Sequence, residues 1–190
     1  TYYIGMVRDM SSVVKDQKQV AHLLNYDQLT GLPNRKVFLS QTSDLLLDSY
    51  QEVVIVRFNI DRYRNLASLL GPDGINTLVK NFVIRMKNLK LDNLHCFSHF
   101  GGDDFALLFE SNNANMIRHQ LDSLMQMCER PFSLDNDAAT DAKIYCHISV
   151  GVSYFPTNDD ELTGLLTKAE KALHYVKQQG GDDICWYDTT

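Results

Sequence analysis

The sequence lacks the features that mark membrane-spanning and secreted proteins. No apolar run approaches the roughly 20 residues that a helix needs to cross a bilayer. The first residues, TYYI, do not begin a charged segment followed by an apolar stretch, as a secretory signal would. An initiator methionine is also missing, so we expect a fragment of something longer. We therefore expect a cytoplasmic domain, although the full-length protein could be tethered to a membrane.

Basic clusters and closely spaced cysteines are missing as well. The net charge is −6, and a duplex binder usually shows a basic patch, so we expect no nucleic-acid partner. A nucleotide is compatible with this charge, because a few local groups and a metal can hold one. The cysteines are far apart and form no C-x-x-C pair, which argues against zinc and fits reduced thiols. They are Cys96, Cys128, Cys146 and Cys185, three of them in apolar runs.

What the sequence does contain is an alternation of helical and strand-like segments. A β-branched run at residues 53–59 predicts a buried central strand. Apolar runs at 94–100 and 105–109 flank adjacent glycines, which predicts a hairpin. The whole pattern predicts an α/β sandwich with a mixed central sheet flanked by helices. Further strands are expected at 144–154 and 184–187, and helices at about 12–25, 33–46, 62–70, 74–88, 114–130 and 159–179.

Residues 1–25 are expected to lie outside the globular domain, which we place at residues 26–190. In the helix predicted there, Val13, Gln17, Val20 and Leu24 recur with 4-3-4 spacing. Such a seam is typical of a two-stranded signalling helix, but a helix packed on its own domain shows the same pattern. The seam is too short to fix the oligomeric state, so a homodimer and a monomer both stay open.

Four short motifs occur along the chain: DQLTGLPNR at 27–35, FGGDDFA at 100–106, ISVGV at 148–152 and AEKALHYVK at 169–177. In this order they resemble those of the GGDEF family of diguanylate cyclase domains. The resemblance implies a fold like the palm of nucleotidyl cyclases and polymerases. It implies that two GTP molecules, one per subunit of a dimer, condense to cyclic di-GMP. It also implies a PAS-type sensor end within residues 1–25 and an EAL phosphodiesterase domain after this one.

The resemblance places metal chemistry at the end of the first core strand and in the hairpin. Two Mg²⁺ ions can stabilise the attacking and leaving oxygens of a phosphoryl transfer. Asp103 matches one metal ligand, but Asn59 stands where the family has an Asp and brings no negative charge. Asp104 matches the catalytic Glu with one methylene fewer, and catalytic groups tolerate such displacements poorly. We expect Mg²⁺ only together with a nucleotide.

The nucleotide contacts that the resemblance implies are only partly kept. The base-edge partners fall on Ala67, which cannot hydrogen-bond through its side chain, and on Asn76. Arg64 and Lys177 match positions that contact phosphate in the family. The remaining implied contacts are Ile60, Gly101 and Gly102.

Other family positions carry different residues. Gly181 stands where the family has an Arg, and the next two residues are acidic, at the place where phosphates would lie. The family's product-inhibition site falls on residues 92–95 and is absent, so we expect no cyclic di-GMP there. His99 replaces the Arg that usually precedes the hairpin. We interpret His99 and His95 as ordinary polar or half-buried residues.

Three hypotheses follow from these losses. The domain is a regulatory module that biases its neighbours, with GTP as a candidate ligand and no cyclisation. Alternatively, the retained Asp103, Asp104 and Arg64 make it a weak cyclase. As a third option, it is a structural or dimerisation unit.

Overall fold

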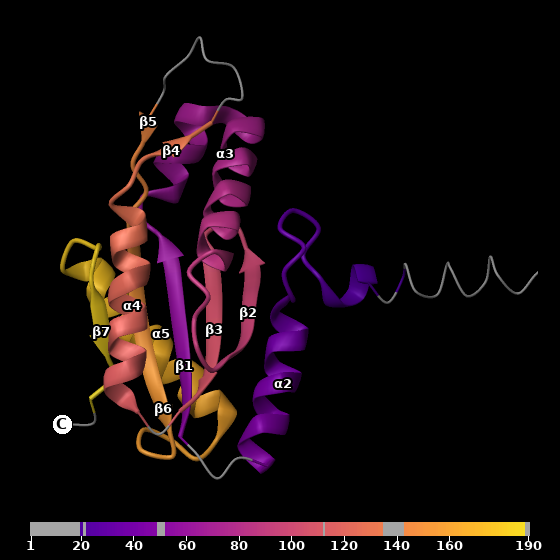
Figure 1. Ribbon diagram of the computed structural model, residues 1–190, viewed down its shortest axis with the longest axis vertical. Helices are drawn as coiled ribbons and strands as arrows, with labels where there is room; N and C mark the ends of the chain where they lie inside the picture. The colour runs from indigo at the N-terminus through magenta and orange to yellow at the C-terminus, as the bar shows by residue number, and fades with distance from the viewer. Residues whose placement is uncertain (1–19, 21, 49–51, 112, 135–142, 189–190) are drawn as a thin grey trace, which may run out of the picture.

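The computed structural model has at its centre a five-stranded sheet with the order β2-β3-β1-β6-β7 (Figure 1). β1 (Val53–Ile60) runs antiparallel to both of its neighbours, β3 (Asp104–Glu110) and β6 (Ile148–Phe155). β2 (Leu94–Gly101) pairs with β3 as a hairpin, and β7 (Ile184–Trp186) is parallel to β6. The mixed sheet confirms the predicted fold class. The structure describes residues 20, 22–48, 52–111, 113–134 and 143–188.

β1 is the central strand because it can be buried on both faces. All eight of its residues are buried, and most are β-branched or aromatic. Successive side chains point to opposite faces, so Phe58 and Ile60 join the larger core while Val53 and Ile55 join the smaller one. The same alternation places two polar residues, Arg57 and Asn59, on the face of the smaller core.

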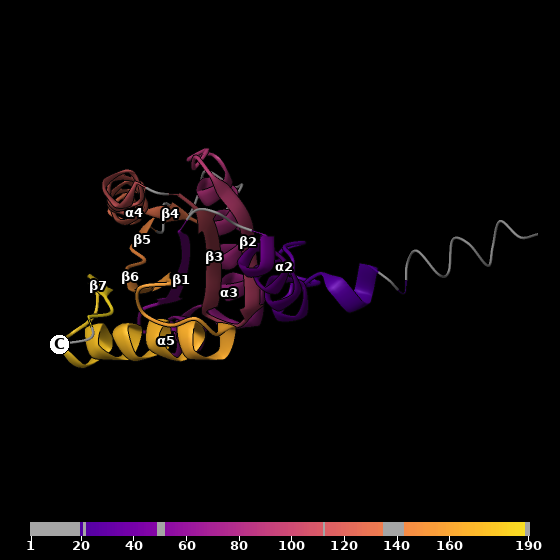
Figure 2. The ribbon, with the colours of Figure 1, turned by 90° about the horizontal axis from the view of Figure 1, so that it is seen from below.

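Helices cover both faces of the sheet. α3 (Tyr63–Lys87) and α4 (Ala114–Cys128) contribute their apolar sides to the larger core. α2 (Arg35–Asp48) and α5 (Leu162–Gln178) contribute Phe38, Leu165 and Ala169 to the smaller one. Figure 2 shows α4 and α5 on opposite sides of the sheet. This layering leaves the end of β1 and the tip of the hairpin accessible near the end of α5.

Two predicted boundaries can be compared with the structure. The helices expected at 62–70 and 74–88 are both present within α3, and non-helical backbone at Gly71, with φ 68° and ψ 179°, separates them. Glycine adopts this positive φ readily, and Pro72 after it suits the first turn of the second helical part. The strand expected at 144–154 is divided into β5 (Lys143–Ile144), which pairs with β4 (Phe132–Ser133), and β6. The apolar pattern runs through both strands, whereas the pairing partner changes between them.

Other predictions at the ends of the chain have mixed outcomes. The PAS-type sensor end implied within residues 1–25, and all but the end of the helix predicted at 12–25, lie outside the described residues. Residues 22–25 are helical, as expected. α5 ends in a glycine cap, in which the Gly181 N–H donates to the Val176 carbonyl at 3.0 Å. In the described part of the chain, no helix is long and apolar enough to span a membrane.

Candidate functional site

A cleft of about 700 Å³ opens where β1 ends, between the hairpin and the C-terminal end of α5. Hereafter it is called the β1 cleft. Its walls carry four basic and four acidic side chains, so the cleft is charged but balanced. The basic residues are Arg57, Arg62, Arg64 and Lys177, and the acidic residues are Asp61, Asp103, Asp104 and Glu170. The remaining lining residues are Asn59, Ile60, Tyr63, Gly180 and Gly181.

The structure brings together most of the predicted site residues. Those that line the β1 cleft are Asn59, Ile60, Arg64, Asp103, Asp104 and Lys177. Asn76, Gly101 and Gly102 are not among the lining residues. Asn76 lies half-buried on α3 beyond the kink, and Ala67 packs against the larger core. The metal and phosphate positions therefore share one cleft, whereas the positions implied for the base edge lie outside it.

Strand register explains how the hairpin acids reach the end of β1. Asn59 faces Asp104 across the β1–β3 pair, and the Ile60 N–H donates to the Asp103 carbonyl at 3.2 Å. The turn requires glycine, since Gly101 and Gly102 have φ values of 112° and 59°. Burial raises the pKa of Tyr63 on the cleft wall, and the negative charge of Asp103 adds a smaller effect in the same direction.

Arg57 is the least expected residue of the site. Its Nη2 donates to both Asp104 carboxylate oxygens, at 2.8 and 2.6 Å, and its Nη1 lies 3.4 Å from Glu170 Oε2. The guanidinium packs 4.8 Å from the centre of the Phe100 ring. The Arg57 side chain is only 6% exposed, so Asp104 neutralises a nearly buried charge. A single charged residue within a β-branched run is the sequence signal that could have identified this position.

The Mg²⁺ ions that the family resemblance implies do not fit this arrangement. Both oxygens of Asp104 are engaged by Arg57, and Asp103 Oδ2 lies 3.9 Å from Lys177 Nζ. Asn59 offers a neutral amide where a carboxylate would be needed. Among the residues that the structure describes, no group of three His, Cys, Asp or Glu side chains is placed to hold a metal.

Asp61 occupies the part of the cleft near Gly181, and the sequence reasoning missed it. Its Oδ1 accepts from Ser149 Oγ at 2.6 Å, and its Oδ2 accepts from the Asp182 N–H at 2.9 Å. A Cβ on Gly181 would come within 2.7 Å of Asp61 Oδ2, and Gly181 has a φ of 83°. Position 181 therefore has no room for a side chain in this arrangement.

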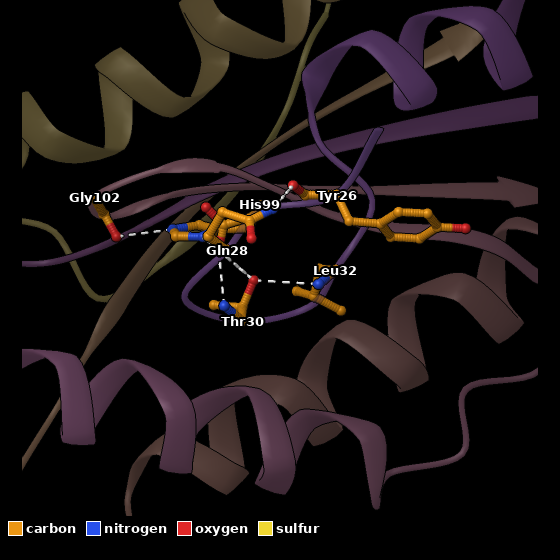
Figure 3. Close-up of polar contacts among 7 residues, drawn as sticks. Tyr26, Gln28, Thr30, Leu32, His99 and Gly102 are labelled. Carbon is orange, nitrogen blue, oxygen red and sulfur yellow. Dashed lines mark hydrogen bonds and ion pairs between the residues drawn. The ribbon is translucent and has the colours of Figure 1, made fainter. Parts of the chain in front are cut away.

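His99 lies on the other side of the hairpin and joins it to residues 26–34, here called the N-terminal turn (Figure 3). Its Nδ1 is 2.8 Å from Asp27 Oδ1, and its Nε2 is 3.0 Å from the Gly102 carbonyl. The ring stacks on Phe105 with a centroid distance of 4.4 Å. The side chain is 1% exposed, so the interpretation of His99 as ordinary or half-buried is wrong. His95 is exposed and pairs with Glu110, as expected of an ordinary polar residue.

Asp27 is held by several donors in this contact. Thr30 donates to its Oδ1 through both the backbone N–H, at 2.8 Å, and the hydroxyl, at 2.6 Å. Burial favours the neutral acid, but the hydrogen bonds from Thr30 and His99 together outweigh burial and lower the pKa of Asp27. The N-terminal turn therefore presents a stabilised carboxylate to the buried imidazole.

Comparisons with known proteins point to one family. The family described as "Diguanylate cyclase, GGDEF domain" matches residues 24–183. The chain is 25% identical to the diguanylate cyclase TpbB of Pseudomonas aeruginosa over 86% of its own length and 38% of that protein. It is 27% identical to the cyclic di-GMP phosphodiesterase NbdA of the same species, over 87% of this chain and 21% of NbdA. The chain thus spans well under half of these curated relatives.

Solved structures give the same fold. The coiled coil and GGDEF domain of DgcB from Caulobacter crescentus, in complex with c-di-GMP, superposes with a TM-score of 0.80. That likeness covers 94% of this chain and 93% of the other at 16% identity, so it shows the fold alone. Together, the family match over most of the chain and the placement of the hairpin beside β1 identify this protein as a member of the GGDEF domain family.

Proposed function

We propose that this protein is a degenerate GGDEF domain of cyclic-di-GMP signalling, which carries out no cyclisation and regulates neighbouring domains, with GTP as its candidate ligand. Neighbours of the sensor and EAL phosphodiesterase types fit the proposal, since relatives such as NbdA are named as phosphodiesterases and are much longer than this chain. Dimerisation through the helix before residue 26 fits as well.

The observation that carries the proposal is the fixed carboxylate of Asp61 beside Gly181. Two hydrogen bonds, from Ser149 and from the Asp182 N–H, hold Asp61 beside Gly181, and position 181 is where the resemblance implies an Arg near phosphate. At an effective dielectric constant of 20, two like charges about 4 Å apart repel by about 4 kcal/mol. An exposed basic side chain such as Lys177 recovers only about 0.2–1 kcal/mol. Near Asp61 the repulsion therefore outweighs the contact with Lys177, so the basic residues of the cleft that remain available to a nucleotide phosphate are Arg62 and Arg64.

The positions of the two residues implied for the base edge also argue against the cyclase hypothesis. Ala67 packs in the core and Asn76 does not line the β1 cleft, so neither is placed to select guanine from within it. Loss of a polar partner costs about 1–3 kcal/mol of discrimination. We expect any nucleotide held here to be bound with little preference for guanine.

The test is an assay for cyclic di-GMP with a dimer enforced, so that a missing partner cannot explain a negative result. The domain is fused to a parallel two-stranded coiled coil and incubated with GTP and Mg²⁺, and the product is measured by chromatography. Calorimetric titration with GTP, with ATP as the control ligand, is run on the same protein. We expect no cyclic di-GMP; steady product formation by the wild-type fusion would refute the proposal.

A weak cyclase is the second candidate, because Asp103, Asp104, Arg64 and Lys177 share one cleft. The substitution Asn59→Asp restores the missing carboxylate. If this change alone produced cyclic di-GMP in the fused dimer, the loss at Asn59 would be the decisive one and the weak-cyclase hypothesis would be favoured. We expect no product from this variant either, since Asp61 and Gly181 are unchanged.

A further inference from the structure

Arg57 and Asp104 are diagonal neighbours on one face of the β1–β3 pair. Arg57 faces Ala106 across the pair and Asn59 faces Asp104, so the register brings the Arg57 side chain alongside the hairpin acid. Asn59 lies on the same face, two residues further along β1. The guanidinium thus lies next to the two positions that the family resemblance assigns to metal binding and catalysis.

The contact engages the whole Asp104 carboxylate. A single nitrogen, Nη2, reaches both oxygens at 2.8 and 2.6 Å, distances typical of charge-assisted hydrogen bonds. The Asp104 side chain is 31% exposed, whereas Arg57 is 6% exposed and is covered by Phe100. The positive member of the pair is therefore the one fixed in place.

Arg57 depends strongly on this partner. Its Nε is buried without a hydrogen-bond partner, and its second acid, Glu170, lies at 3.4 Å and is 66% exposed. Withdrawing Asp104 would leave the nearly buried guanidinium with Glu170 alone as an acidic partner, which is unfavourable. A divalent cation at Asp104 would have to take the carboxylate from Arg57 and lie within a few ångströms of a fixed positive charge.

The positions next to Asp104 provide few negatively charged ligands for a cation. Asp103 lies 3.9 Å from Lys177, and Asn59 is neutral. Among the described residues, the two cleft arginines without an ion-pair partner are Arg62 and Arg64. The cleft therefore has basic groups available for an anion but no uncommitted pair of carboxylates for a metal.

We propose that Arg57 is a built-in cation, whose guanidinium takes the place of a metal ion beside Asp104 and keeps divalent cations out of the β1 cleft. This inference rests on the proposed function in that it concerns the same cleft. It adds the reason why a hairpin that retains two acids would not assemble a metal centre.

The experiment measures Mn²⁺ binding to the nucleotide-free domain by electron paramagnetic resonance. Four variants are compared with wild type: Arg57→Met, Asp104→Asn, the double variant Arg57→Met/Asp104→Asn, and Glu170→Gln. Methionine keeps much of the length and the apolar contact with Phe100 but removes the charge. Glu170→Gln is the matched control, because it removes the more distant and more exposed partner of the same guanidinium. Circular dichroism establishes that each variant is folded.

We expect Arg57→Met to tighten Mn²⁺ binding at least about tenfold over wild type, and the added Asp104→Asn to remove that gain. Glu170→Gln and Asp104→Asn alone should leave the weak wild-type binding unchanged. Equal affinity of wild type and Arg57→Met would overturn the inference. So would a loss of Mn²⁺ affinity in Asp104→Asn alone, a result that does not depend on the folding of the Arg57 variant. Because no nucleotide is present, these outcomes are separate from the test of cyclisation.

Discussion

The two sides of the β2–β3 hairpin differ in how fully their polar atoms are matched. On the side of the N-terminal turn, both ring nitrogens of His99 have partners within 3.0 Å and the ring stacks on Phe105. On the side of the β1 cleft, Arg57 has one close partner, one at 3.4 Å and an unpartnered Nε. The first contact joins two segments of the chain, whereas the second lines a cleft where a ligand would lie.

The contact between the hairpin and the N-terminal turn therefore stabilises the fold, whereas the β1 cleft is the part of the domain that could bind a ligand. The family resemblance implies an Arg at position 99, and there His99 is matched by Asp27 and Gly102. The resemblance also implies charged residues at positions 59 and 181, where this chain has the uncharged Asn59 and Gly181. Under the proposed function, the hairpin keeps its attachment to the N-terminal turn while the cleft loses charged groups.

The largest expected effect is on the His99 side. His99→Ala would leave a cavity against Phe105 and remove the buried partner of Asp27 and Gly102, so we expect a loss of about 3 kcal/mol in the free energy of unfolding. Urea denaturation measures it. The control is His95→Ala, at an exposed position, which should change stability by less than about 0.5 kcal/mol. Similar losses in both variants would remove the distinction between the two histidines.

A smaller effect is expected at Gly181, beside Asp61 in the β1 cleft. Gly181→Ala should cost about 2 kcal/mol, because the residue has a positive φ and its Cβ would meet Asp61. Gly180→Ala is the control, since φ is also positive there but no atom lies within 4 Å of the added Cβ. The backbone strain differs at the two positions, because φ is 83° at Gly181 and 119° at Gly180, so the contact with Asp61 is isolated by a further variant. Adding Asp61→Ala should lower the cost of Gly181→Ala and leave the cost of Gly180→Ala unchanged. An unchanged cost of Gly181→Ala in the Asp61→Ala background would show that Asp61 moves aside freely.

A still smaller effect is expected for the Arg57 pair. Asp104 is partly exposed and can be hydrated once it is unpaired, so the coupling energy between Arg57 and Asp104 should be about 1 kcal/mol. A double-mutant cycle with Arg57→Met and Asp104→Asn, followed by urea denaturation, measures the coupling. A coupling above the cost of His99→Ala would reverse the comparison between the two sides of the hairpin.

The smallest expected effect is the contribution of Asp27 to the pH dependence of stability. The pKa of Asp27 is lowered in the folded protein from its ordinary value of 3.8, so this carboxylate contributes stability above pH 3.8. The contribution is lost as the pH falls from 3.8 through the lowered pKa. Wild type should therefore lose more stability than Asp27→Asn over this acid range, by about 1 kcal/mol or less, in denaturation curves recorded at successive pH values. Parallel curves for the two proteins would show that Asp27 does not titrate differently on folding.

Much of the fold could be predicted from the sequence because apolar periodicity and glycines mark it directly. The run at 53–59 and the two glycines of the hairpin gave the central strand and its neighbour. The pattern failed at residues 144–154, because an apolar run does not say where a strand changes its pairing partner. The apolar pattern did mark the two helical parts of α3 on either side of Gly71.

The candidate site was predicted less completely. Resemblance to family motifs supplied the positions of Asn59, Asp103 and Lys177, and these do meet in one cleft. Arg57 and Asp61 match none of the motif positions used, and their roles depend on side-chain contacts across strands and from the end of α5. Spacing along the chain carries no information about such contacts, so only the three-dimensional arrangement reveals them.

The contacts of His99 also determine how many N–H groups its ring must donate. The Asp27 carboxylate and the Gly102 carbonyl both accept hydrogen bonds, and a neutral imidazole has only one N–H to donate. Both contacts are complete only in the imidazolium form. A neutral ring would lose one of these two side-chain hydrogen bonds, while the His99 backbone N–H would still donate to the Pro33 carbonyl at 3.0 Å.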